Sequence, residues 1–401
     1  MIDIIGGLYK EYCDSGRWSE LYGSGLRAAA ALSYRCDDVR LKGCVGKKDI
    51  ATANAVAGTF GIQLAASLID ETVSFSYLHG LASPEIFPKP ARASVPLTLV
   101  GDNVLAFGMI ENDWQIVGKR VVYDPQDPVH PIGFRGRENC QADLLAIVCN
   151  SNELRLLTNV EDITEAALAL LSMESAEVVV VKCGARGALV CTSNGVEKVP
   201  AFRTSSVWPL GSGDVFAANF AHQWACLENE AVESALAASK ATAFYCQERT
   251  LPIPLDVEDT LGKKLSPIVL NDEAKKKKIY LAGPFFSVME RWMIEETRSL
   301  LSQSGFDVFS PLHDVGIGSA SEVVQQDLRG LETCDGVFAV LDNLDSGTIF
   351  EVGYARARDL PVVGYAENVA EESLKMLEGT DCHIHRDFVS AIYILQWVMG
   401  E

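Results

Sequence analysis

Strand-like and helix-like stretches alternate along the C-terminal part of the chain. Four short apolar runs are separated by amphipathic stretches of helical period, and the runs read KIYLAG (278–283), DVFSP (307–311), GVFAVLD (336–342) and PVVGY (361–365). This alternation predicts a parallel sheet with helices on both faces. In such sheets, ligands bind at the carboxyl ends of the strands.

Three carboxylates lie near the predicted strand ends. Glu351 falls in the early turns of the helix after GVFAVLD, where the positive end of the helix favours its ionised form. Asp345 lies in the preceding turn. Asp327 shares one helix face with Val323 and Leu331, so we expect it to point inward. Converging carboxylates suit chemistry on a group that becomes cationic, and glycosidic cleavage is the leading example.

Each carboxylate also has a structural interpretation. Glu351 could only complement the helix dipole. Asp345 could be a turn or N-cap residue. Asp327 could hold a cap or pair with Arg329 or Arg356. The three together, beside the Gly-Pro turn after KIYLAG, favour the functional interpretation.

Three stretches carry a resemblance to the nucleoside 2-deoxyribosyltransferase family: IYLAGPFFS, QQDLRGLETCDGVFAVLD and DSGTIFEVGYA. The likeness spans roughly residues 278–399. It implies that Glu351 is the nucleophile that attacks C1′ of a deoxynucleoside and that Tyr280 orients it. It also implies that Asp327 and Asp345 bind and protonate the leaving base. The pocket loop would contain Gly283 and Phe286.

Two departures concern the sugar 5′ end. Family members often carry Asn-x-Met where this chain reads SLKM, so only Met376 matches the residues that bind this end. Related monophosphate glycosidases tend to have a serine at the Asp345 position. An aspartate there would repel a phosphate, which favours an unphosphorylated nucleoside. The preferred base stays open. The acceptor, water or a second base, stays open as well.

A glycine turn before a helix is the most informative stretch of the N-terminal part. In WPLGSGDVFAANF, residues Gly211, Ser212 and Gly213 let backbone N–H groups approach an anion at the start of the helix. Asp214 could then accept a proton from a substrate hydroxyl. The alternative is an aspartate that caps the helix.

Further stretches, in order, carry a second resemblance: VVYDPQDP, LLAIVCNSNELRLL and AEVVVVKCGARGALV. With GSGD, they resemble the ribokinase (PfkB-type) sugar and nucleoside kinases over about residues 1–249. The resemblance implies Asp214 as catalytic base, an anion hole at Gly211 to Gly213, and ATP with Mg²⁺ as cofactors. Asn150 and Glu153 would organise phosphate and Mg²⁺, with Glu153 acting indirectly on the metal. Gly184 would lie near the nucleotide.

The acceptor side departs from this family. Glu11 stands where sugar kinases usually have an aspartate, and Arg27 stands where they have an asparagine. Arginine is longer and always charged, so the exchange is not conservative. Either the substrate differs from a common sugar, or this half has lost catalysis and keeps a binding or scaffold role.

We therefore predict an α/β chain of two domains, as the length of 401 residues favours. Residues 1–252 form a ribokinase-like three-layer α/β/α domain, 253–277 a proline-containing linker, and 278–401 a smaller doubly wound, flavodoxin-like domain. The net charge of −20 argues against nucleic-acid polymers and anionic membranes as main partners. Scattered cysteines without metal spacing, and a start without a signal-peptide pattern, favour the cytoplasm.

The leading hypothesis is a bifunctional enzyme of nucleoside metabolism that acts on small molecules. Its C-terminal domain cleaves a deoxynucleoside, and its N-terminal domain phosphorylates a nucleoside or sugar. The alternative is a nucleotide- or nucleoside-degrading glycosidase whose kinase-like half senses a ligand, and a third hypothesis is a non-catalytic scaffold. The apolar closing stretch VSAIYILQWVMG must be covered, so we predict a homo-oligomer through the C-terminal domain, with a core helix as the alternative.

Overall fold

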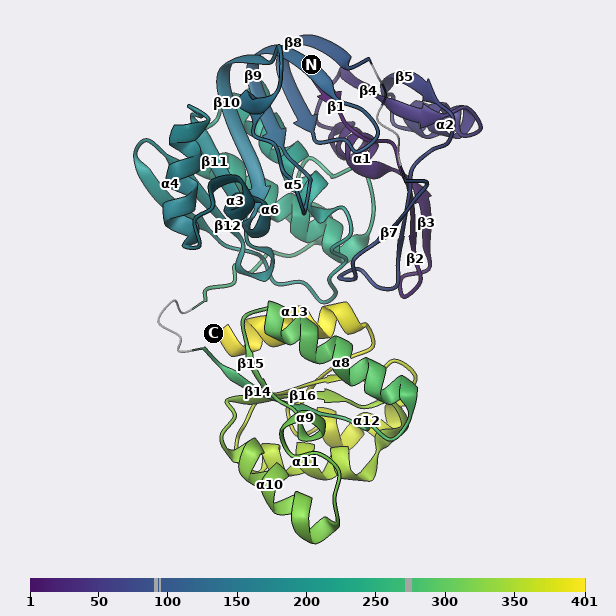
Figure 1. Cartoon of the computed structure of the whole chain (residues 1–401), viewed down its shortest axis with the longest axis vertical. Helices are drawn as coiled ribbons and strands as arrows, with labels where there is room; N and C mark the ends of the chain where they lie inside the picture. Colours follow the sequence, from purple (N-terminus) through teal and green to yellow (C-terminus); the bar gives the residue numbers. More distant parts are fainter. Residues whose placement is uncertain (90–92, 94, 271–275, 401) are drawn as a thin grey trace. The chain divides into compact units, whose positions relative to one another are not determined.

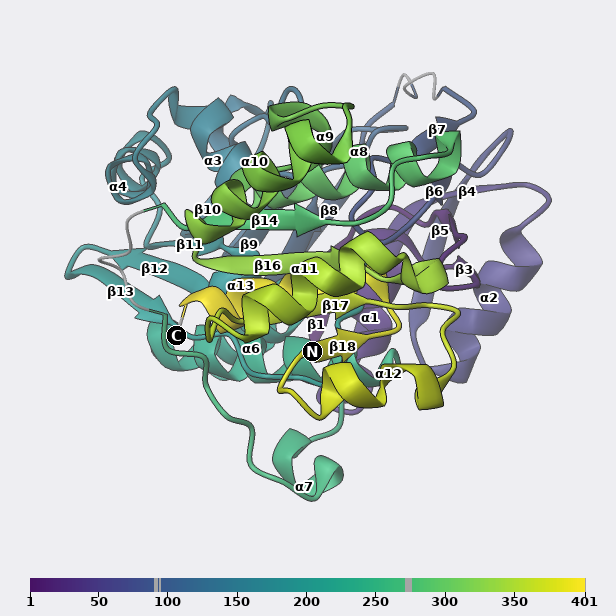
Figure 2. The ribbon, with the colours of Figure 1, turned by 90° about the horizontal axis from the view of Figure 1, so that it is seen from below.

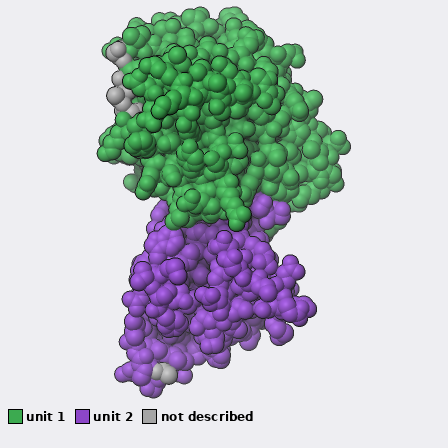
Figure 3. All heavy atoms as spheres, turned by 90° about the vertical axis from the view of Figure 1, so that its right-hand side faces the viewer, with its two compact units in different colours: residues 1–204, 208–267 green, residues 205–207, 268–401 purple. Residues whose placement is uncertain are grey.

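The computed structural model describes residues 1–89, 93, 95–270 and 276–400. Contacts divide the chain into two compact units, coloured separately in Figure 3. The first unit comprises Met1–Thr204 and Trp208–Pro267, and the second comprises Ser205–Val207 and Ile268–Glu401. None of the helices within the described ranges has the length and apolarity needed to cross a bilayer.

The first unit is built on a nine-stranded sheet (Figure 1). Neighbouring strands pair in parallel except at β11–β12 and β12–β13, which are antiparallel. In spatial order the strands are β13 (Gly195–Val199), β12 (Ala188–Thr192), β11 (Val178–Lys182), β10 (Gln141–Asn150), β9 (Trp114–Asp124), β8 (Leu97–Phe107), β1 (Ile2–Ile5), β4 (Val39–Gly46) and β5 (Gln63–Ile69).

Helices cover both faces of this sheet and close two apolar cores. One core holds buried side chains of α1, α2, α5 and α6, and the other holds those of α3 and α4. The helices are α1 (Gly23–Leu32), α2 (Ile50–Thr59), α3 (Ser151–Thr158), α4 (Ile163–Met173), α5 (Ser212–Ala221), α6 (Ala231–Glu248) and α7 (Val257–Leu261), with short helical turns η1 (Phe134–Gly136), η2 (Gly184–Arg186) and η3 (His222–Cys226). The result is the predicted three-layer α/β/α arrangement.

A second, four-stranded sheet belongs to the same unit. Its strands lie in the order β3 (Trp18–Leu21), β2 (Lys10–Cys13), β6 (Ser74–Tyr77) and β7 (Glu85–Phe87). Strand β2 carries Glu11, whose side chain is buried. This small sheet therefore contributes one charged group to the interior of the first unit.

The second unit has a five-stranded, all-parallel sheet. Its strands lie in the order β15 (Asp307–Phe309), β14 (Lys278–Ala282), β16 (Gly336–Val340), β17 (Val362–Tyr365) and β18 (His383–His385). This is the 2-1-3-4-5 order of doubly wound, flavodoxin-like sheets. The predicted α/β fold class is confirmed for both units.

Helices α8 and α13 lie on one face of the second sheet, and α10, α11 and α12 lie on the other (Figures 1 and 2). The bounds are α8 (Val288–Gln303), α9 (Pro311–Asp314), α10 (Ala320–Glu332), α11 (Ser346–Arg356), α12 (Glu371–Glu378) and α13 (Phe388–Gly400), with η4 (Asp342–Leu344) before α11. The apolar helix α13 packs against β17 and β18. It is a core element of its own unit, so its apolarity alone gives no reason to expect an oligomer.

The segment predicted as a linker is partly structured. Helix α7 lies within it, and Ile253, Val257 and Leu265 are buried in a core of the first unit. By its contacts the first unit reaches Pro267, whereas residues 271–275 of the predicted linker lie outside the described residues. The exact domain bounds stay a prediction.

Candidate active sites

The order of strands in the second unit reverses between β14 and β16, and this is where such sheets bind ligands. Tyr280 lies on β14, paired in register with Phe309 of β15 and Val337 of β16. Glu351 lies on α11, the helix that follows β16. The hydroxyl of Tyr280 donates a hydrogen bond of 2.6 Å to Oε1 of Glu351. The pair predicted from the sequence is therefore brought together at the expected place.

Tyr280 is fixed by its surroundings. It is fully buried, and its ring stacks on Phe309 with centroids 5.5 Å apart. Burial, the charge of Glu351 and the hydrogen bond to it all raise the pKa of Tyr280. The phenol therefore stays protonated at neutral pH and can hold the Glu351 carboxylate in one orientation.

Glu351 titrates close to neutrality. Burial raises its pKa to about 7, the hydrogen bond from Tyr280 opposes this rise, and the charges of Asp327 and Asp345 add to it. These effects act on one carboxyl group at a strand end. The arrangement suits a group that has to be both a nucleophile and a leaving group near pH 7.

Asp327 lies on α10 and faces inward, as its helical spacing predicted. Leu331, one turn further on, is fully buried. Oδ1 of Asp327 is buried without a hydrogen-bond partner among the described residues, and burial raises the pKa of this carboxyl. A buried, unpartnered oxygen beside Glu351 is suited to hold a proton or bind a polar group of a ligand.

Asp345 is the N-cap of α11, which was one of the interpretations that the sequence left open. Its Oδ2 accepts hydrogen bonds from the backbone N–H of Thr348 at 2.9 Å and from the Thr348 hydroxyl at 3.0 Å. Asp345 also contributes to the raised pKa of Glu351. Asp345 thus caps α11 and raises the pKa of Glu351 with the same side chain. A direct role in binding the nucleobase stays a prediction.

The other residues expected in this pocket are placed less tightly. Gly283 follows β14, and a side chain there would meet Ile294 and Val340 at 2.8 and 3.0 Å, so close packing requires the glycine. Phe286 and Met376 are 73% and 78% exposed. Their roles at the pocket rim stay predictions.

In the first unit, the predicted glycine turn begins α5. Gly211 is its N-cap in the left-handed conformation, with φ of 77°, and Ser212 and Gly213 open the helix. Lys182, at the end of β11, has its Nζ 3.4 Å from the position that a Cβ on Gly213 would take. A cation beside the start of a helix fits the binding of an anion such as a phosphate.

Lys182 forms an ion pair with Asp124, at the end of β9. Burial raises the pKa of Asp124 to about 7, while the Lys182 ammonium lowers it, and Oδ1 of Asp124 has no partner among the described residues. This pairing was not predicted from the sequence. The position of Lys182 in KCGARG, directly after a strand, was the available signal.

Asn150 and Glu153 form a capping box at the start of α3. Oδ1 of Asn150 accepts from the N–H of Glu153 at 2.9 Å, and Oε2 of Glu153 accepts from the N–H of Asn150 at 2.9 Å. Within the described ranges, no three His, Cys, Asp or Glu residues are grouped as metal ligands. Mg²⁺ commonly takes one or two carboxylates plus waters and substrate phosphates, so an indirect role for Glu153 stays a prediction. Gly184 opens η2 with a φ of 57°.

On the acceptor side, Arg27 lies between Glu11 and Asp214. Its NH1 is 3.0 Å from Oε1 of Glu11 and 2.9 Å from Oδ2 of Asp214, and its NH2 is paired with Oε2 of Glu11. Its Nε donates to the hydroxyl of Tyr245 at 3.2 Å. The two substrate-side residues predicted from the sequence are therefore joined to the predicted base. Tyr245 and Gln126, which donates to Oδ1 of Asp214 at 2.6 Å, were not predicted.

Together, these sites define a chain of two α/β units, one with a phosphate-binding type of helix start and one with a carboxylate site at a switch point. Comparison with protein families finds a match within each of them. Residues 135–256 match the family model for pfkB family carbohydrate kinases, and residues 279–384 match that for nucleoside 2-deoxyribosyltransferases. Both resemblances inferred from the sequence are confirmed.

Solved structures similar to the chain include kinases of the ribokinase family. Ribokinase from Thermotoga maritima has 17% identity and a TM-score of 0.50, covering 66% of this chain and 99% of that chain. A nucleoside kinase from Methanocaldococcus jannaschii has 14% identity and a TM-score of 0.48, covering 66% and 98%. No curated protein matched the chain. The likeness to ribokinase shows the fold of the first unit.

Proposed function

We propose that the second unit cleaves the N-glycosidic bond of a 2′-deoxynucleoside. The observation that carries this proposal is the hydrogen bond between Tyr280 and Glu351 at the switch point of the sheet. The match to the deoxyribosyltransferase family supports it over residues 279–384. A carboxylate held by a protonated phenol is a suitable nucleophile for a sugar carbon.

In this reaction the Glu351 carboxylate attacks C1′, so that an O–C1′ bond forms as the C1′–N bond breaks. The bonding electron pair leaves with the base, which takes up a proton. Asp327 is the proposed source, because its raised pKa favours the protonated form and one of its oxygens has no partner. A second base or water then attacks C1′ and releases Glu351.

The local charge favours a neutral deoxynucleoside as substrate. Asp327 and Asp345 act electrostatically on Glu351, and the ionised carboxylates of this site stabilise positive charge on the sugar in the transition state. The same carboxylates would repel a 5′-phosphate. We therefore propose an unphosphorylated substrate, while the base and the acceptor stay open.

For the first unit, two roles were expected: phosphorylation of a nucleoside or sugar, and sensing of a ligand. The pfkB match and the GSGD helix start support binding of ATP, whose phosphates Gly211, Gly213 and Lys182 would hold, with Mg²⁺ near Glu153. Bound Mg²⁺ would neutralise phosphate charge. The ion pair between Arg27 and Asp214 favours the sensing role.

The test is a product assay with the full chain and a panel of deoxynucleosides and their monophosphates, with and without a second base and ATP. Glu351→Ala should abolish cleavage and leave the fold intact. Glu332→Gln is the matched control, because Glu332 is exposed and pairs with Tyr354 and Arg358. A glycosylated Glu351 peptide, detected by mass, would support the proposal directly. Wild-type turnover by a folded Glu351→Ala chain would contradict it.

We also propose a homo-oligomer assembled through the second unit, and a cytoplasmic location. Since α13 packs within its own unit, the oligomer rests on the family resemblance, in which sites are completed across subunits. Exposed apolar side chains at the start of α8, Val288 at 85% and Met289 at 80%, offer a contact surface.

A further inference from the structure

The position where a kinase of this family would receive its acceptor holds an arginine of the chain itself. Arg27 is only 1% exposed, although it carries a permanent charge. A side chain on Gly211 would come within 2.2 Å of Nε of Arg27. The guanidinium therefore lies directly against the glycine that begins the predicted anion hole.

Arg27 has little capacity left for a ligand. Of its five N–H donors, one meets Tyr245, two on NH1 meet Glu11 and Asp214, and one on NH2 meets Glu11. A guanidinium with four donors held by buried partners has a single N–H left, so a bidentate bond to a phosphate would require it to break one of these contacts. Arg27 is held in place by its partners like a structural residue. It is not positioned as an arginine that binds a phosphoryl group during transfer.

Both oxygens of the carboxylate that should act as base also have a partner within the chain. Oδ2 of Asp214 accepts from Arg27, and Oδ1 accepts from Gln126 at 2.6 Å. Glu11 is equally held, by the N–H of Gly23 at 3.2 Å and by Nε1 of Trp18 at 3.3 Å, besides Arg27. The ion pair with Arg27 and the bond from Gln126 stabilise the ionised form of Asp214 and so weaken it as a base for an acceptor hydroxyl.

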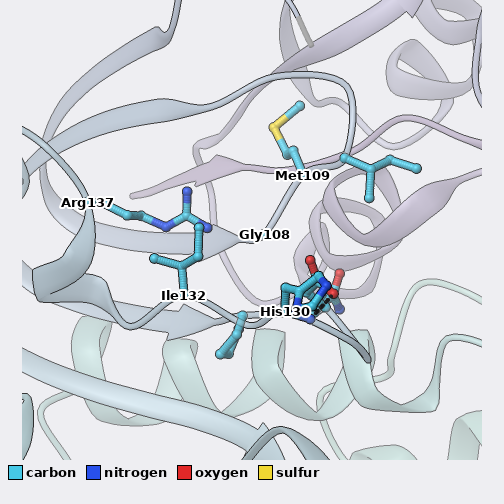
Figure 4. A pocket seen from close by; sticks show the side chains of 9 residues that line it. Gly108, Met109, His130, Ile132 and Arg137 are labelled. Atoms are coloured by element: carbon cyan, nitrogen blue, oxygen red, sulfur yellow. Dashed lines mark hydrogen bonds between the residues drawn. The ribbon is translucent and has the colours of Figure 1, made fainter. Parts of the chain in front are cut away.

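A small opening lies at the carboxyl ends of β8 and β9 (Figure 4). Gly108, Met109, His130 and Arg137 are among its lining residues, and so is Gln126. Glu11, Arg27 and Asp214 do not line it. Gln126 lines this opening and donates to Asp214, so the amide separates the opening from the carboxylate.

We propose that Arg27 closes the acceptor position of the first unit, so that this unit binds a nucleoside polyphosphate without transferring its phosphoryl group to an alcohol. The inference rests on the kinase-like role proposed for this unit. The phosphate side is kept, because Gly211, Gly213 and Lys182 remain arranged for an anion. A nucleotide bound there would serve as a regulatory ligand and not as a phosphoryl donor.

The experiment uses the full chain with MgATP. Binding is measured by calorimetry, phosphoryl transfer with a panel of sugars, polyols and nucleosides, and transfer to water by phosphate release. We expect the wild-type chain to bind MgATP and to show neither reaction. Arg27→Asn should open the position to water and increase phosphate release by about tenfold or more, because Asp214 loses the ion pair that weakens it as a base. Asp214→Asn in that background should remove the gain.

Arg27→Asn leaves two buried carboxylates without their partner, so the double variant Glu11→Gln/Arg27→Asn is made in parallel, with Arg40→Asn as the matched control. Arg40 pairs with Asp3 but is 40% exposed. Transfer to any alcohol by the wild-type chain, lost in Asp214→Asn, would overturn the proposal. So would absence of MgATP binding, or a folded double variant that stays silent. Glycosidic turnover of the same samples reports separately on the second unit.

Discussion

Replacing Tyr280 by phenylalanine should move the pH profile of glycosidic cleavage without abolishing the reaction. The nucleophile must be ionised, and the pKa of Glu351 is raised to about 7, so cleavage by the wild-type chain should rise with pH through about 7. The hydrogen bond from Tyr280, 2.6 Å long, stabilises the ionised form. Its loss therefore raises the pKa further, and the rising limb moves to higher pH.

The size of this change follows from the contact. A hydrogen bond to a charged group contributes about 1.5–3 kcal/mol, and a pKa difference of one corresponds to about 1.4 kcal/mol. The limb of Tyr280→Phe should thus move upward by about one to two pH units. At pH 7 the variant should be roughly tenfold or more slower than wild type, and the difference should shrink at high pH.

The assay is kcat/KM for a deoxynucleoside between about pH 5 and about pH 10. Tyr354→Phe is the control, because Tyr354 lies on α11 like Glu351 and donates a hydrogen bond of 2.6 Å to Glu332 on the surface. Its profile should coincide with that of wild type. A folded Tyr280→Phe chain with an unshifted rising limb would refute the idea that the phenol sets the charge of Glu351.

Three further predictions concern stability and assembly. The pKa of Glu351 is raised in the folded state from 4.5 to about 7, so folding stability should fall as pH rises through this window. In denaturant titrations, the free energy of unfolding lost between about pH 5 and about pH 8 should be smaller in Glu351→Gln, by up to about 3 kcal/mol. Arg27→Ala should destabilise the first unit by about 3–5 kcal/mol, because it leaves Glu11 and Asp214 buried and unpaired, whereas Arg40→Ala should cost less, because it leaves one carboxylate unpaired and Arg40 itself is 40% exposed. Light scattering of the full chain should show an oligomer, and a monomer with full glycosidic activity would contradict the proposed assembly.

Local patterns predicted much of the second unit. The buried runs became β14, β15, β16 and β17, and the helical stretches between them became α8, α10 and α11. Strand β18 was missed because His383–His385 is short and partly polar. The start of helix α8 at Val288 follows from Ser287 and Glu290, which form a capping box whose Ser-x-x-Glu spacing is visible in the sequence.

The contacts of the first unit could not be predicted in the same way. The GSGD turn is local, and the start of α5 at that position agrees with it. The ion pair of Arg27 with Asp214 joins residues 187 positions apart, and no periodicity of either segment encodes it. The unusual arginine was visible, but its partners depend on how the small sheet, α1 and α5 come together. Contacts between side chains that are far apart in the sequence therefore become known only from the structure.

The N-cap of α11 has an evolutionary consequence. Aspartate and serine are about equally good N-cap residues, so Asp345→Ser would keep the start of α11. It would thereby keep Glu351 at the same place in the site. The same exchange removes a negative charge from the site. A descendant of this chain could therefore come to accept a more anionic substrate through one substitution that costs almost no stability. Selection can act on substrate charge here while the scaffold stays the same.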